Sequence, residues 1–197
     1  MKPPLNTPLR RALIIVALLN LGYFGVEFAV ALHIGSVSLL ADSVDFLEDA
    51  SVNTLILIAF SWSPRHRAKL GMCLAALLLA PALAGLWTAV VRLASFTPPA
   101  ALTLSMTGTG ALVVNLGCAF LLARHRDQSG SLTRAAFLSA RNDAIANIAI
   151  ICAGLVTSRW PTIWPDLIVG IGIALLNIDA ARVVWQAARS EHRDAAA

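Results

Sequence analysis

The chain has 197 residues, of which 58% are hydrophobic and only 13% are charged. Soluble domains carry about 25% charged residues, so this composition and a mean hydropathy of +0.75 exclude an ordinary soluble domain. The net charge of +4 does not favour nucleic acid as a partner, because the Lys and Arg residues sit at the ends of apolar runs instead of along one amphipathic face.

Six apolar runs follow one another along the chain, each near the roughly 20 residues that cross a bilayer. Gly, Ser and Pro residues separate the runs, as is typical of turns. We expect membrane-spanning helices over about 11–32, 37–60, 70–93, 102–123, 132–157 and 163–187. The sequence therefore predicts an all-α integral membrane protein, a six-helix bundle within one domain of residues 1–190, followed by a short disordered tail of residues 191–197.

The first run begins after basic residues, as a secretory signal peptide also does. It is longer than the apolar region of a signal peptide, however, and it contains Asn20 and Glu27. We interpret it as a retained first helix.

The basic residues predict the orientation of the bundle. Twelve of the 15 lie beside the two termini and in the second-to-third and fourth-to-fifth loops, and only Arg92 and Arg159 lie in the other loops. Arg141 lies within the fifth span. Because Lys and Arg concentrate in cytoplasmic loops, both termini are predicted to be cytoplasmic, and the bacterial inner (plasma) membrane is the expected location. Tryptophans stand near span ends, where aromatic belts form: Trp62, Trp160 and Trp164.

The third span has small residues at a spacing of four, Ala76, Ala80 and Ala84. Such a stripe lets two helices approach closely. Packing inside one protomer and the seam of a homodimer are both compatible with it.

Acidic residues accumulate inside the second span. Asp45 and Asp49 are one helical turn apart and therefore share a face, which Asp42 joins three residues before Asp45. A carboxylate in the middle of a span costs about 2.5–3.5 kcal/mol to insert. A chain that keeps several of them is expected to use them.

The fifth span repeats this pattern with oxygen-bearing side chains, Ser139, Asp143 and Asn147, at successive turns of one face. Two helices that offer oxygen ligands to a common interior form a cation site, and a divalent ion would neutralise the charge of the carboxylates. Asp166 and Asp179 lie nearer to helix ends and are interpreted as structural carboxylates. The partner of Arg141 stays open between Asp166, Glu27 and a water-filled cleft.

Several motifs in order resemble the cation diffusion facilitator, or cation efflux, family over nearly the whole transmembrane portion. They are Asn20 through Glu27, Gly35-Ser36, Leu39-Leu40-Ala41-Asp42, Asp45-x-x-x-Asp49, Val114-Asn115, Leu132-Thr133-Arg134-Ala135-Ala136, and Asp166 at the start of the sixth helix. The resemblance implies an antiporter that exports a divalent metal from the cytoplasm in exchange for protons. It implies a metal site of Asp45, Asp49, Asp143 and the Ser139 position, which we expect to be lined further by Asp42, Asn147 and Glu27.

Two departures from the family pattern bear on this expectation. Many members have His where this chain has Ser139, and all four His residues here map to loops or termini. Zinc favours nitrogen and sulfur ligands, whereas an all-oxygen site suits harder ions such as Mn²⁺ or Mg²⁺. The identity of the metal stays open between Zn²⁺, Mn²⁺, Fe²⁺ and Co²⁺. No permanently bound cofactor is expected. The family's usual cytoplasmic metal-binding domain after helix six is also missing from this sequence.

These departures motivate an alternative function, a transport-inactive membrane partner or metal-sensing subunit on the same scaffold. An intramembrane aspartyl protease is disfavoured because the sequence around Asp45 and Asp143 lacks the GxGD context of such enzymes. The three cysteines, Cys73, Cys118 and Cys152, lie within apolar runs and are interpreted as small buried hydrophobic residues. We therefore expect a transporter and not an enzyme, with lipid, metal ions and protons as partners.

Overall fold

The computed structural model describes residues 7–59, 83, 85–124 and 131–176; of these, residues 59 and 131–141 are described as helical backbone only. The described part is all helical and contains no strand. Its long helices are α1 (Thr7–Ile34), α2 (Val37–Ala59), α4 (Ala101–Ala123) and α5 (Ser131–Arg159). Two shorter helices cover residues 85–95 and Trp164–Leu176.

The helices lie where the apolar runs of the sequence lie. The spans expected at 37–60, 102–123 and 132–157 correspond to α2, α4 and α5, and α1 extends the span expected at 11–32 at both ends. Several sequence features fall outside the described residues: the rest of the third and sixth spans, Trp62, Asp179 and the small-residue stripe of Ala76, Ala80 and Ala84.

A tight turn joins α1 to α2 and makes the two helices antiparallel. Gly35 has a φ of +63°, the left-handed conformation that ends many helices and that glycine adopts without strain. The N–H of Ser36 then donates to the carbonyl of Ala31 at 3.0 Å and closes the last turn of α1. The Gly35-Ser36 pair therefore sets the entry of α2 into the bundle.

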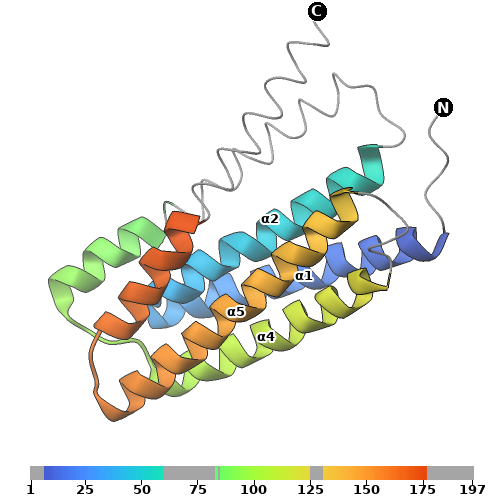
Figure 1. Cartoon of the computed structure of the whole chain (residues 1–197). Helices are drawn as coiled ribbons and strands as arrows, with labels where there is room; N and C mark the ends of the chain where they lie inside the picture. The colour runs from blue at the N-terminus through green and yellow to red at the C-terminus, as the bar shows by residue number, and fades with distance from the viewer. Residues whose placement is uncertain (1–6, 60–82, 84, 125–130, 177–197) are drawn as a thin grey trace, which may run out of the picture.

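The four long helices form one bundle, in which α1 packs on α2 and α4, and α5 packs on α4 and α2 (Figure 1). Glycines bring α4 and α5 close together, because a Cβ at Gly108 would meet Ile150 and one at Gly154 would meet Ser105. The two shorter helices lie at the end of the bundle where α1 turns into α2, coloured green and red in Figure 1. Side chains from these helices, from α2 and from Ile163 just before the second short helix form one apolar cluster there: Val37, Ala89, Ile163 and Leu167.

Polarity is inverted relative to a soluble bundle. Large apolar side chains such as Leu102 and Met106 are 74% and 66% exposed, whereas Asn20, Glu27 and Asp42 are completely buried. Such an exterior suits lipid, and intramembrane polar groups are expected to face the bundle interior. Among the described helices, α1 and α4 are long and apolar enough to cross a membrane. The apolar exterior, the polar interior and these two helices together indicate a membrane protein.

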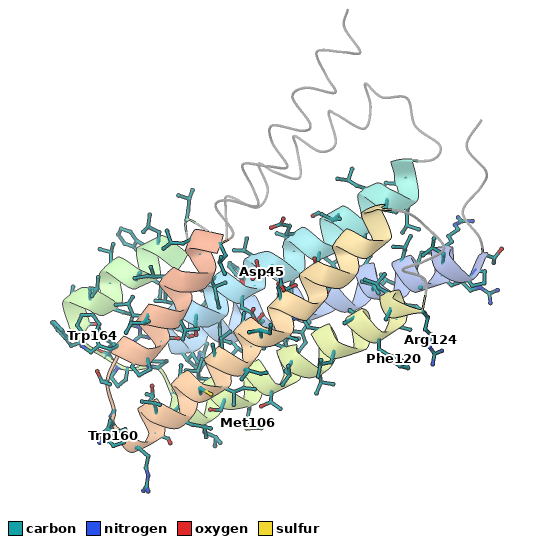
Figure 2. All side chains as sticks on the ribbon, viewed as in Figure 1. Asp45, Met106, Phe120, Arg124, Trp160 and Trp164 are labelled. Atoms are coloured by element: carbon teal, nitrogen blue, oxygen red, sulfur yellow. The ribbon has the colours of Figure 1, made fainter. Side chains whose placement is uncertain are left out.

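The two ends of the bundle differ chemically. Trp160 and Trp164, which are 69% and 51% exposed, lie at the end near the short helices, and Arg124 lies at the opposite end of α4 over the ring of Phe120 (Figure 2). The tryptophans accord with an aromatic belt at their end of the bundle. Basic residues occur at both ends, because Arg92 and Arg159 lie at the tryptophan end. The cytoplasmic location of both termini stays a prediction.

Candidate metal site

The acidic face of α2 lies inside the bundle. Because α2 is helical from Val37 to Ala59, Asp42, Asp45 and Asp49 follow one another along one side of it. Asp42 is completely buried, Asp49 is 6% exposed and Asp45 is partly buried. Figure 2 labels Asp45 where α2 passes α5.

Helix α5 contributes to the same interior. The side-chain amide of Asn147 donates to both carboxylate oxygens of Asp42 at 3.0 Å, and it also donates to the backbone carbonyl of Asp143 at 2.8 Å. Asp143 itself lies within electrostatic range of Asp42, Asp45 and Asp49. Asp143 and Asn147 of α5 therefore interact with acids of α2 in one polar interior, and their role as a metal site stays a prediction.

Ser139 lies one turn before Asp143 on the backbone of α5, and its side chain is outside the described residues, as is that of Arg141. Its place as a ligand stays a prediction. The partner of Arg141 also stays open, because its side chain lies outside the described part of the structure.

Glu27 of α1 adds a third helix to this interior. It is completely buried, and neither of its carboxylate oxygens accepts a hydrogen bond from a described donor. The carboxyl group of Asp42 lies beside it, close enough for the two to hydrogen-bond if one carries a proton. Tyr23, one turn earlier on α1, donates its hydroxyl to the carbonyl of Thr107 at 2.6 Å and so does not serve Glu27.

Two buried acids side by side, with no described cation against Glu27, are unfavourable unless a proton or a metal ion neutralises them. A proton shared between Glu27 and Asp42 would give each of them a hydrogen-bond partner.

Two further polar side chains, which the sequence analysis did not assign to the site, also line this interior. Asn53 follows Asp45 and Asp49 at the same four-residue spacing; its amide donates to the Asp49 carbonyl at 2.7 Å, and its own side-chain oxygen has no described partner. Cys118 of α4 is buried within electrostatic range of Asp49 and Asp143, and its thiol donates to the side-chain oxygen of Asn20 at 3.8 Å.

The spacing could have identified Asn53, because it continues the acidic face. Cys118 also belongs to a buried apolar cluster, which agrees with its interpretation as a small buried hydrophobic residue. For Cys152 that interpretation is wrong, because this residue is exposed.

The oxygen atoms of these side chains are ligands of the kind that hard divalent ions prefer. Their positions in the structure, however, do not form a complete coordination shell. Among the described side chains, no three of His, Cys, Asp and Glu lie close enough together to hold one metal ion. Carboxylates repel one another when no cation lies between them, so a bound ion would draw the acids of α2 and α5 together. His33, at the end of α1, is exposed and lies away from these acids.

The family described as the cation efflux transmembrane domain matches residues 13–190, which include every candidate site residue. The comparison with curated proteins gives no match to the chain.

Proposed function

Since the chain belongs to the cation efflux family, whose members are transporters, we propose that it exports a divalent metal ion from the cytoplasm in exchange for protons. The supporting observation is the meeting of α2 and α5, where the Asn147 amide bridges to Asp42 and Asp143 lies among the acids of α2. The metal ion is the transported substrate, and Asp45, Asp49, Asp143 and Ser139 are its proposed ligands.

The acidic interior explains why a divalent cation would enter a membrane-embedded bundle. Several carboxylates in a low-dielectric surrounding repel one another strongly. A divalent ion removes this repulsion and gains oxygen ligands that replace its water shell. Alternate exposure of this interior to the two sides of the membrane would then move the ion across.

Proton exchange follows from the same groups. A carboxylate binds metal only when it is deprotonated, so metal and protons compete for the site and each weakens the binding of the other. Glu27 and Asp42, side by side on α1 and α2, offer a position for a proton next to the metal ligands. Binding of metal on the cytoplasmic side would release protons, and their return from the outside would expel the ion.

The donor atoms set the proposed preference among metals. The described acids and amides offer oxygen, and oxygen ligands suit Mn²⁺ better than Zn²⁺. Fe²⁺ and Co²⁺ are intermediate in this respect. We therefore propose Mn²⁺ as the preferred substrate over Zn²⁺.

The test is metal-driven proton movement in proteoliposomes that contain the purified protein and a pH-sensitive dye. Asp49→Ala and Asp143→Ala should each abolish the flux, whereas Ile145→Ala should leave it unchanged, because Ile145 lies on the same helix with 61% of its surface exposed. Normal flux in both aspartate variants, at equal protein incorporation, would refute the proposed site. A wild-type protein that binds no divalent ion but co-purifies with another membrane protein would instead favour the transport-inactive alternative.

A further inference from the structure

The turn between α1 and α2 is held by side chains from two other helices. Asp166, near the start of the Trp164–Leu176 helix, is 2% exposed and accepts hydrogen bonds from Ser36 and from the first two residues of α2, Val37 and Ser38. One carboxylate oxygen accepts from the hydroxyls of Ser36 at 2.6 Å and Ser38 at 2.5 Å, and from the Ser38 N–H at 3.2 Å. The other oxygen accepts from the Val37 N–H at 2.8 Å.

These bonds satisfy a specific need of α2. The first N–H groups of a helix have no partner within the helix, and they carry the positive end of its dipole. Ser36 serves one of them locally, since its hydroxyl accepts from the Leu39 N–H at 3.2 Å. Asp166 serves the Val37 and Ser38 groups from about 130 residues away in the chain. It therefore acts as an N-terminal cap that another helix supplies, and its negative charge matches the dipole.

Arg92 serves the end of α1 in the complementary way. Its guanidinium donates to the carbonyl of Ile34 at 2.6 Å and to that of Thr97 at 3.1 Å. A cation suits the negative end of a helix dipole. The guanidinium also occupies the space that a Cβ of Gly35 would fill. The 85–95 helix thus binds the last residue of α1 through Arg92, and the Trp164–Leu176 helix binds the first residues of α2 through Asp166.

The backbone of the Trp164–Leu176 helix also packs closely against the start of α2. Gly170 lies one turn after Asp166, and a Cβ there would overlap the backbone of Val37 and Ser38. The apolar cluster of Val37, Ala89, Ile163 and Leu167 surrounds the same contact. The start of α2 is therefore joined to the Trp164–Leu176 helix by polar bonds, by close backbone approach and by apolar packing.

We propose that Asp166 is a positioning residue of the transporter, which fixes the first turn of α2 to the Trp164–Leu176 helix and thereby sets where α2 presents its acids. This rests on the proposed function. Asp45 follows Ser38 by seven residues, about 10 Å along a helix that rises 1.5 Å per residue. A rigid helix transmits a displacement at its start over that distance to the acidic face.

Asp166 should affect the rate of transport but not the affinity of the metal site. Asn147 holds Asp42 to α5 independently of Asp166, so metal ligands should stay assembled when the cap is lost. Alternating access, in contrast, requires helices to move as defined units. Loss of the cap lets α2 move without the Trp164–Leu176 helix. The maximal transport rate should therefore fall, whereas the affinity for the metal ion should not change.

The first test is Asp166→Asn in proteoliposomes over a range of Mn²⁺ concentrations, with calorimetric Mn²⁺ binding in parallel. The amide keeps the volume of the side chain but presents N–H groups where hydroxyls and backbone N–H groups need an acceptor. Because conformational steps set the turnover rate of many proteins, we expect the maximal rate to fall about tenfold. The Kd for Mn²⁺ should stay within about twofold, because Asn147 still holds Asp42 to α5. Trp164→Phe, an exposed position two residues earlier, should change neither. An unchanged rate, or a Kd weakened as much as the rate, would overturn the proposal.

The second test needs no transport, so it distinguishes failure of this inference from failure of the proposed function. In a chain whose native cysteines are replaced by Ala, Val37→Cys and Leu167→Cys place two thiols within one apolar cluster. An oxidant should cross-link them readily, and the rate should fall several-fold when Asp166→Asn is added. Ser38→Ala removes one hydroxyl donor and should give a smaller decrease, which supplies a milder variant if Asp166→Asn does not accumulate. Equal cross-linking rates with and without these changes would overturn the proposal.

Discussion

Two buried carboxylates of this chain differ in their surroundings although they are equally hidden from solvent. Asp166 is 2% exposed and accepts four hydrogen bonds, from Ser36, Val37 and Ser38. Glu27 is completely buried, accepts none from a described donor and lies beside another acid, Asp42. A buried carboxylate whose oxygens accept several hydrogen bonds stabilises the fold, whereas one without donors needs a proton or a cation to neutralise it.

The position along a helix explains this difference. At the start of α2 the backbone N–H groups are unused and can serve a carboxylate. In the middle of a helix every N–H is bonded to a carbonyl four residues earlier, so an acid there depends on side chains. Asp42 finds one such donor in Asn147, and Glu27 finds none among the described residues. Acids in the middle of the bundle are therefore suited to cations and acids at its end to caps.

The largest expected effect is on metal affinity. Asp143→Ala should weaken Mn²⁺ binding about 100-fold, or roughly 2.7 kcal/mol, because it removes a proposed ligand of α5. The melting temperature of the metal-free protein should not fall, since a like charge facing Asp49 is lost. Calorimetry and thermal unfolding in detergent measure the two quantities. A lower melting temperature with full affinity would mean that the centre of the bundle is structural, like its end.

The end of the bundle should show the opposite response. Gly35→Ala forces a φ of +63° on a residue with a Cβ and places that Cβ against the Arg92 guanidinium. We expect a loss of about 2 kcal/mol of stability, with an unchanged Kd for Mn²⁺. Gly22→Ala is the matched control, because a Cβ at Gly22 meets nothing. If both glycine variants unfold at the same temperature, the turn is less constrained than the structure indicates.

The choice of metal tests the ligand set itself. Ser139→His adds a nitrogen ligand one turn before Asp143, and it should shift the ratio of Zn²⁺ to Mn²⁺ affinity roughly tenfold toward Zn²⁺. Competition binding with the two ions measures this ratio. An unchanged ratio would show that Ser139 is not a ligand.

The smallest expected effect concerns the orphaned acid. Glu27→Gln supplies an amide that can donate to Asp42, and it should stabilise the metal-free protein by about 1 kcal/mol. The gain should be larger in alkaline than in acidic buffer, because the wild-type pair needs a proton that Gln does not. Melting temperatures across pH, compared with those of Gly22→Ala, measure it. A destabilised variant would show that Glu27 has a donor that replaces the need for a proton.

Much of the candidate site follows from helical spacing. The four-residue interval of Asp45 and Asp49 places them on one side of α2, and that of Asp143 and Asn147 does the same on α5. Asn53 was missed although it continues the first series. Cys118 could not be found in this way, because a lone cysteine in an apolar run has no pattern and only packing brings it near Asp49.

The sequence by itself determined the helices, the apolar exterior, the resemblance to cation efflux proteins and which acids share a face. It did so because these properties depend on composition and on spacing within single segments. Tertiary structure alone decided that Asn147 bonds Asp42, that Glu27 has an acid for a neighbour and that Asp166 caps α2. Helical periodicity fixes the direction of side chains around one axis, but which faces meet depends on the packing of helices that are distant in the chain.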